Sequence, residues 1–245
     1  MIDAHNHLQD KRLDSFPNKV FTTSMVNGTC EDDWKHVAEL AEKFPDQVIP
    51  NFGLHPWFVN ERTENWEATL NKFLDRLPNA GVGEVGIDKW IRDHDIAVQQ
   101  PIFETQICIA AEREIPLTIH CLRAFGRLKE ILDRNPLPQA GFLLHSYSGP
   151  ADLVEDFLKL GAYFSISGYF MHERKAAARE IFRRIPIERL LIETDAPDMP
   201  MPGSEIPNDP ADIAPIYEFA AELRGMELAD FETQIAENFG GFRRE

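Results

Sequence analysis

The chain has 245 residues, of which 43% are hydrophobic and 27% charged, and this composition excludes an intrinsically disordered protein. Its formal net charge of −16, from 25 basic and 41 acidic residues, excludes tight nonspecific binding to long nucleic acid. A nucleic-acid substrate stays open, because bound divalent cations reverse the local field. No apolar run approaches the ~20 residues that a membrane span requires.

The three cysteines follow no spacing pattern, which indicates reduced thiols rather than a disulfide framework. The first predicted strand begins at Met1, so we expect no signal peptide. Together these features predict a cytoplasmic protein with no membrane partner.

Short apolar runs alternate with amphipathic ones along the chain. The apolar runs predict strands at Met1–His5, Val20–Val26, Val48–Gly53, Gly81–Val85, Leu117–His120, Phe142–His145, Tyr163–Ser167 and Leu190–Glu193. Residues at helical spacing separate most of them, for example Val37, Leu40, Ala41 and Phe44. Eight strands that alternate with helices predict a parallel (β/α)8 barrel, with residues 1–245 forming a single domain.

Three segments depart from this alternation. Gln9–Lys19 is short and contains Pro17, so we expect a loop or a single turn there. The proline-rich segment Asp195–Pro210 is too long for a plain connector, and we expect it to cover the mouth of the barrel. Two helices then finish the chain, at Ala211–Leu223 and Leu228–Phe239.

Metal-ligand residue types gather at the carboxyl ends of the predicted strands. His5 and His7 lie two apart on the first strand, which aims both imidazoles at one spot. On its own this pair is weak evidence, but further candidates end or follow later strands: Glu84, His120, His145 and Asp195. Barrel active sites are built at that face, so these residues predict a two-metal hydrolase site.

Other residues near these strand ends allow two interpretations. His55 either lines the site and binds substrate or orders a turn with Pro56. Arg123 either holds an anionic group of the substrate, which we favour, or pairs with a surface acid. Asp88 is a helix cap or a partner of a metal-binding histidine, and Glu193 has a similar supporting role. Three more histidines are expected at the surface: His36, His94 and His172.

One motif is misleading. Gly81-Val82-Gly83-Glu84-Val85-Gly86 matches the GxGxxG dinucleotide pattern. That pattern requires a strand before the glycines and a helix after them. Here a predicted helix, Trp66–Leu77, comes before, and the glycines lie inside a strand. We therefore reject a nucleotide site.

The sequence resembles the TatD-like metal-dependent hydrolases. The matching segments run the length of the chain: Asp3-Ala4-His5-Asn6-His7-Leu8, Gly53-Leu54-His55-Pro56, Gly83-Glu84-Val85-Gly86-Ile87-Asp88, Pro116-Leu117-Thr118-Ile119-His120, His145-Ser146-Tyr147-Ser148-Gly149, Glu193-Thr194-Asp195-Ala196-Pro197 and Asn208-Asp209-Pro210. Two departures are a shorter first connection and Tyr147 where phenylalanine is more usual.

The resemblance implies a distorted TIM barrel of the amidohydrolase type with two divalent metals. His5, His7, Glu84 and Asp195 would hold the first metal. Glu84 would bridge to the second, which His120 and His145 complete. Characterised relatives include DNases that remove nucleotides from DNA 3′ ends.

We therefore predict a phosphodiesterase that acts as a 3′–5′ exodeoxyribonuclease on short or single-stranded DNA ends. Asp195 would bind metal and accept a proton from the attacking water, and Arg123 would balance phosphoryl charge. The metal is Mg, Mn or Zn. An amide or ester hydrolase acting on a small substrate is the alternative enzyme, and a non-catalytic metal-bound scaffold is the third hypothesis.

Overall fold

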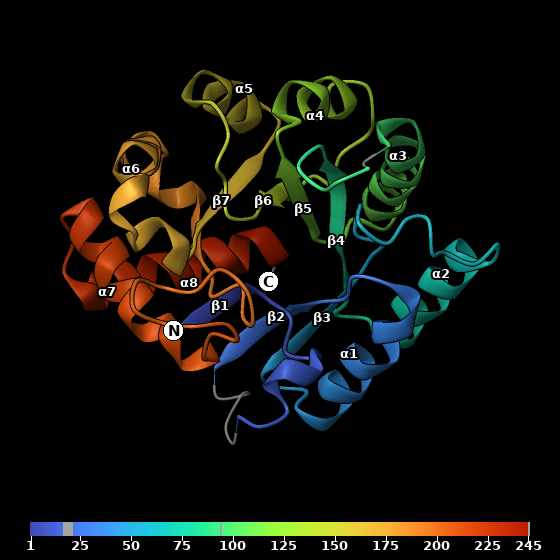
Figure 1. Ribbon diagram of the computed structural model, residues 1–245, viewed down its shortest axis with the longest axis horizontal. Coiled ribbons are helices and arrows are strands. Elements are labelled where there is room, and N and C mark those ends of the chain that lie inside the picture. The colour runs from blue at the N-terminus through green and yellow to red at the C-terminus, as the bar shows by residue number, and fades with distance from the viewer. Residues whose placement is uncertain (17–21, 94, 245) are drawn as a thin grey trace.

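Eight parallel strands form one sheet in the order β1 to β8 and curve into a barrel in the computed structural model, which describes residues 1–16, 22–93 and 95–244 (Figure 1). The strands are β1 Ile2–Asn6, β2 Thr23–Asn27, β3 Val48–Phe52, β4 Gly81–Asp88, β5 Leu117–Leu122, β6 Phe142–Leu144, β7 Ala162–Ile166 and β8 Leu190–Ile192. The predicted barrel is confirmed. The predicted strand start at Val20–Phe21 lies outside the described residues, as does His94.

The helices lie on the outside of the barrel (Figure 1). They are α1 Glu31–Lys43, α2 Trp66–Arg76, α3 Ile96–Arg113, α4 Phe125–Leu132, α5 Val154–Lys159, α6 Ala176–Arg184, α7 Ile213–Arg224 and α8 Leu228–Arg243. Between β1 and β2 the described residues hold only a short 3-10 turn, Lys11–Leu13, in agreement with the predicted single turn. Within the described residues, no helix is both long enough and apolar enough to cross a membrane.

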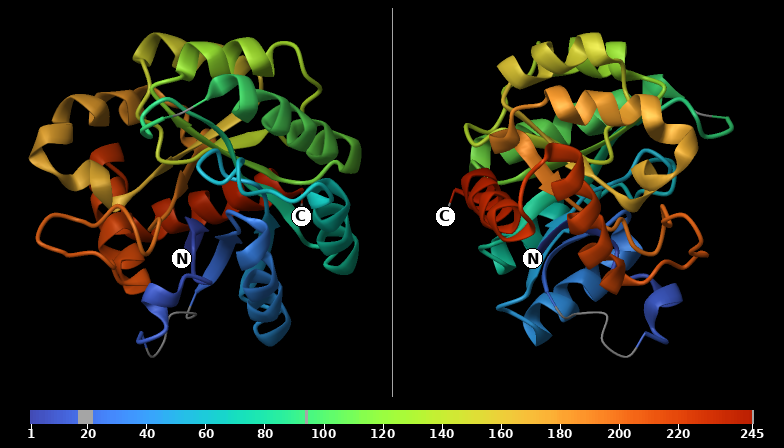
Figure 2. Two further views of the ribbon diagram at one scale, coloured as in Figure 1. Left: turned by 45° about the vertical axis from the view of Figure 1, so that its right-hand side comes forward. Right: turned by 90° about the vertical axis from the view of Figure 1, so that its left-hand side faces the viewer.

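Apolar side chains seal one end of the barrel. Helix α8 lies against the amino ends of the strands (Figure 2). Its Phe239 and Phe242 side chains belong to a buried apolar cluster at this end. The strands contribute Ala4, Met25, Ile49, Leu143, Tyr163 and Leu191 to the cluster. This end is therefore filled, and the opposite, carboxyl end of the strands is left for a site.

The glycines of the misleading motif belong to strand β4, as predicted. A side chain at Gly86, where φ is +150°, would lie 2.0 Å from the carbonyl oxygen of His120 on β5. At Gly83 it would lie 2.6 Å from Asn27 Oδ1. Because Gly83 has no side chain, Asn51 on β3 reaches Thr118 on β5 across the barrel interior, at 3.3 Å. Close packing within the barrel therefore explains these glycines.

The barrel closes between β1 and β8 through a buried carboxylate. Asp3 is 1% exposed and accepts hydrogen bonds from the Thr194 backbone N–H (3.0 Å) and hydroxyl (2.6 Å) and from the Asn6 amide (2.9 Å). Burial raises the pKa of Asp3 to about 7, although these hydrogen bonds act in the opposite direction. Next to it, the Asp195 N–H donates to the carbonyl oxygen of His5 at 3.0 Å. Asp3 thus links β1 to the segment after β8, next to His5 and Asp195, and we call this junction of the first and last strands the seam.

This seam predicts a stability effect. Asp3→Ala removes the acceptor for the buried donors of Thr194 and Asn6, and each buried donor left without a partner costs about 1–3 kcal/mol. Three donors lose their acceptor, so we expect the free energy of unfolding, measured with denaturant, to fall by about 3 kcal/mol or more. The control is Asp133→Ala, which removes only an exposed ion pair with Lys129 on α4 and should cost less than about 1 kcal/mol. Equal losses in the two variants would contradict a sealing role for Asp3.

Candidate metal centre

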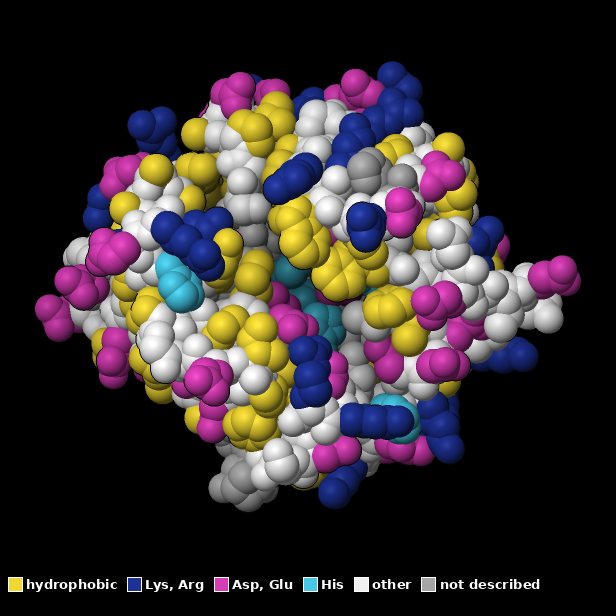
Figure 3. Space-filling model, viewed as in Figure 1, with side chains coloured by type: hydrophobic (Ala, Val, Ile, Leu, Met, Phe, Trp, Pro, Cys, Tyr) yellow, Lys and Arg dark blue, Asp and Glu magenta, His cyan; other side chains and the backbone are white. Residues whose placement is uncertain are grey.

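The predicted site residues meet at the carboxyl ends of the strands. The space-filling view of this face shows histidine and acidic side chains at the bottom of a hollow near its centre (Figure 3). The residues come from β1, β4 and β5 and from the segments that follow β1, β3, β6 and β8: His5, His7, His55, Glu84, His120, His145 and Asp195.

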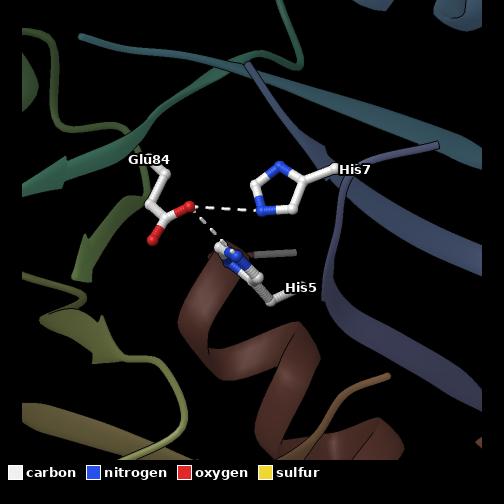
Figure 4. Close-up of side chains that lie close together, drawn as sticks. All are labelled: His5, His7 and Glu84. Carbon is white, nitrogen blue, oxygen red and sulfur yellow. Dashed lines mark ion pairs between the residues drawn. The ribbon is translucent and has the colours of Figure 1, made fainter. Parts of the chain in front are cut away.

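Glu84 is the centre of the cluster. Its carboxylate is 3% exposed, and its Oε2 atom lies 3.2 Å from His7 Nε2 and 3.5 Å from His5 Nε2 (Figure 4). The two histidines form the His-x-His pair at the end of β1 and face the same oxygen, as their spacing predicts.

The other oxygen of Glu84 faces a second set of imidazoles. Its Oε1 atom lies 2.9 Å from His120 Nδ1, 3.0 Å from His145 Nε2 and 3.4 Å from His55 Nε2. One buried carboxylate thus spans two groups of histidines, one on each of its oxygen atoms.

A second carboxylate approaches the first group. Asp195 Oδ1 lies 3.5 Å from His5 Nε2 and 3.6 Å from His7 Nε2, and the residue is 6% exposed. Its backbone has a φ of +55°, in the left-handed region, directly after β8. Asparagine and aspartate tolerate this conformation better than most residues.

Oxygen atoms bind the outer nitrogens of two of the rings and face the outer nitrogen of a third. His7 Nδ1 lies 2.8 Å from the Asn27 carbonyl oxygen, and His120 Nε2 lies 2.9 Å from Asp88 Oδ2. His145 Nδ1 faces the fully buried Glu193 at 3.5 Å. Such partners orient a histidine so that its other nitrogen points at a metal.

The donor set fits divalent metal ions. Both ring nitrogens of the fully buried His5 lack a hydrogen-bond partner, and buried polar atoms are normally satisfied. The potential ligands form three groups, and within each group the ligand atoms lie within 4.8 Å of one another. The groups are His5, His7 and Glu84; His5, His145 and Asp195; and His55, Glu84 and His120. Neutral imidazole and carboxylate are common ligands of Zn²⁺ and Mn²⁺.

Burial and charge act against each other in the pKa values of the cluster. Burial lowers the pKa of His5 and of His55 to about 4, so both rings are neutral at pH 7, as metal ligation requires. For His7 and His145 burial acts the same way, but the neighbouring carboxylates outweigh it and hold each pKa well above the usual value. For Glu84, burial opposes ionisation, but the surrounding imidazoles hold its pKa well below the usual range.

The remaining candidates lie outside the cluster. Arg123 is exposed and follows β5, with a φ of +55°, and within the described residues it forms no hydrogen bond or ion pair with the candidate metal ligands. His36 is exposed, as expected, whereas His172 is half-buried and its Nε2 lies 3.0 Å from the Pro200 carbonyl oxygen. The loop after β8 also reaches the first connection, where Asp198 pairs with Arg12.

Sequence reasoning missed two parts of the site. The Asn27 contact uses a backbone carbonyl, which any residue supplies, so the sequence carries no signal for it. Trp57 donates its indole N–H to Asp88 Oδ2 at 2.7 Å, next to His120. The sequence signal for Trp57 was its position two residues after His55, a candidate site residue. Tryptophan is more often buried in the core, so this position alone did not predict a place in the site.

Comparisons with known proteins agree with this geometry. The model of the family described as TatD related DNase matches residues 2–242. The uncharacterized metal-dependent hydrolase YjjV of Escherichia coli K12 is 30% identical over 203 residues, which cover 82% of this chain and 78% of YjjV. The 3′–5′ ssDNA/RNA exonuclease TatD of Edwardsiella piscicida is 33% identical over 225 residues, covering 87% and 84%.

Solved structures share the whole fold. The crystal structure of Escherichia coli YjjV superposes with a TM-score of 0.92 at 26% identity and covers 100% of this chain and 98% of its own. The structure of a hydrolase of the TatD family from Entamoeba histolytica has a TM-score of 0.83 at 17% identity, covers 99% and 97%, and shows the fold alone. The match over residues 2–242 places this chain in the TatD-related DNase family, whose members are metal-dependent hydrolases.

Proposed function

We propose that this protein is a two-metal hydrolase that removes nucleotides from the 3′ ends of short or single-stranded nucleic acid. The observation that carries the proposal is the Glu84 carboxylate, which faces a different set of imidazoles with each oxygen. A carboxylate shared in this way suits a bridge between two metal ions. Relatives about 30% identical, named as 3′–5′ ssDNA/RNA exonucleases, support the choice of substrate.

The two groups of side chains define the proposed ligands. His5, His7, Asp195 and Glu84 Oε2 would hold one metal, and Glu84 Oε1, His120 and His145 the other. His55 faces the second group at 3.4 Å, and we assign it to the substrate. When bound, two divalent ions of this kind supply Lewis-acid stabilisation and lower the pKa of water.

The chain's own residues then perform the proton transfer and hold the charge. Asp195 Oδ1 lies 3.5 Å from His5 Nε2 and 3.6 Å from His7 Nε2, and we propose that its carboxylate accepts the proton of the attacking water. Arg123 follows the strand that carries His120, and we assign its exposed guanidinium to the phosphoryl oxygens of the substrate. Phosphoryl transfer of this kind depends mainly on such positioning and charge stabilisation.

The first test is metal content. Protein purified without chelator should contain up to two divalent ions per chain by elemental analysis, which also identifies the metal among Mg, Mn and Zn. Glu84→Ala should lose most of both, because it removes the ligand that the two groups share. Asp198→Ala is the control, since this exposed carboxylate pairs with Arg12 and lies outside the cluster. Full metal content in Glu84→Ala would show that the bridging assignment is wrong.

The second test concerns the base. Asp195→Asn keeps the size of the side chain and tolerates the left-handed backbone, so the fold should survive. The substitution removes the proton acceptor, and kcat should fall by roughly 10²–10⁴-fold. Melting temperature and metal content measured on the same sample separate loss of the base from loss of structure or of metal. Near-normal turnover would remove Asp195 from the mechanism.

The third test uses the net charge of −16. If the enzyme holds only one or two phosphates at a strand end, KM should depend shallowly on salt, with a logarithmic slope of magnitude about 1–2. KM is measured against KCl concentration for a dinucleotide and for a long single-stranded oligonucleotide. Much tighter binding of the long substrate would reveal a basic track. No cleavage of either with Mg²⁺, Mn²⁺ or Zn²⁺ would instead favour the amide or ester hydrolase.

A further inference from the structure

Two tryptophans stand exposed beside the metal centre. Trp57 is 40% exposed and Trp90 is 54% exposed. In the described part of the chain, only two other large hydrophobic side chains are exposed to this degree, those of Met1 and Ile206. Trp57 follows β3 and Trp90 follows β4, so both lie on the face that carries the ligands. Hydrophobic side chains border the hollow that contains the histidines (Figure 3).

The two indoles are stacked against each other. Their ring centroids lie 6.1 Å apart with an angle of 26° between the planes, which is an offset stack. The Trp57 ring lies 5.2 Å from the ring of His55 and 6.4 Å from that of His120. The aromatic surface therefore lies next to the candidate metal centre, with the Trp57 ring adjacent to both histidine rings.

One buried carboxylate sets the position of both tryptophans. Asp88 is fully buried, and its Oδ2 accepts the Trp57 indole N–H at 2.7 Å and contacts His120 Nε2 at 2.9 Å. Its Oδ1 accepts the backbone N–H groups of Trp90 and of Ile91. Asp88 thus ties the tryptophan pair to a histidine of the metal centre.

Folding alone does not account for this arrangement. An indole that stays about half exposed gives up much of the free energy that its burial would contribute. Large apolar groups left exposed together in a rigid setting are typical of binding surfaces. A flat aromatic surface next to a hydrolytic centre suits a flat aromatic group of the substrate.

We propose that Trp57 and Trp90 form a stacking platform for a nucleobase adjacent to the phosphate that is cleaved. The inference rests on the proposed nuclease function and deepens it. Every nucleobase has a π face, so stacking accepts all sequences and needs no basic residues. This matters in a chain of net charge −16, which attracts a polyanion poorly.

The test compares ends with and without a base. The substrates are a single-stranded oligonucleotide and the same strand with abasic residues at its 3′ end. Wild-type protein should have a lower kcat/KM on the abasic end. Trp90→Ala should lose roughly 5- to 100-fold in kcat/KM on the normal end, mainly through KM, and almost nothing on the abasic end. Trp90→Phe should recover most of the loss, because it keeps an aromatic face.

The control variant is Asp133→Ala. It removes an exposed side chain at the end of α4, on the outside of the barrel, where its partner is Lys129, and it should change the rate on neither substrate. Equal losses by Trp90→Ala on both substrates, or no loss on the normal end, would overturn the platform. So would a wild-type enzyme that cleaves both ends equally well.

A binding measurement separates this inference from the proposed function. Adenosine 5′-monophosphate should quench tryptophan fluorescence saturably in the wild-type protein, with little dependence on salt, and Trp90→Ala should abolish the saturable part. If the protein cleaves no oligonucleotide yet shows this quenching, the nuclease proposal fails and a base-stacking site stands. If it cleaves oligonucleotides and Trp90→Ala quenches as the wild type does, the platform fails and the nuclease stands.

Discussion

The structure of the site depends on the burial of one charge, the carboxylate of Glu84. Burying an ionised carboxylate costs several kcal/mol unless charged or hydrogen-bonding partners surround it. Here five imidazoles lie within 3.5 Å of its two oxygens: those of His5, His7, His55, His120 and His145. Metal ions and protons compete for the same nitrogens, so metal binding would release protons from His7 and His145, whose pKa values the carboxylates hold high. The barrel brings these five rings together because the strands and strand ends that carry them meet at one face.

Two irregular strands make that convergence possible. Ala4 packs in the sealed end of the barrel, so regular alternation would turn its neighbour His5 outward. The pairing of β1 with β2 shifts register between Asp3 and Asn6, and His5 faces the interior. In β4 the register shifts between Val82 and Val85, and Glu84 turns inward although Gly83 also faces the interior. Such bulges re-aim side chains at active sites.

These shifts mark the limit of what the sequence predicts. The eight strands and the gathering of ligands at their carboxyl ends follow from hydrophobic periodicity and the rules of parallel barrels. The side to which each ligand points depends on local register shifts in β1 and β4, and the hydrophobic alternation along a strand does not reveal such shifts. Strand ends were also misplaced, since β4 runs to Asp88, three residues beyond its predicted end. The exposure of Trp57 and Trp90 depends on tertiary packing. The roles assigned to the site residues stay predictions.

Asp88 connects the chemistry to the choice of substrate. Its burial opposes ionisation, but the hydrogen bonds from His120 and Trp57 outweigh this and lower its pKa to about 2. An ionised Asp88 therefore orients a metal-site histidine and an aromatic surface together. On the proposed function, stacking would hold a base without a positive surface, so an acidic protein could bind the end of a nucleic acid while its charge repels the rest of the strand. For the proposed nuclease, the charge that opposes binding along a strand is compatible with action at the terminus, where few phosphates need to be neutralised.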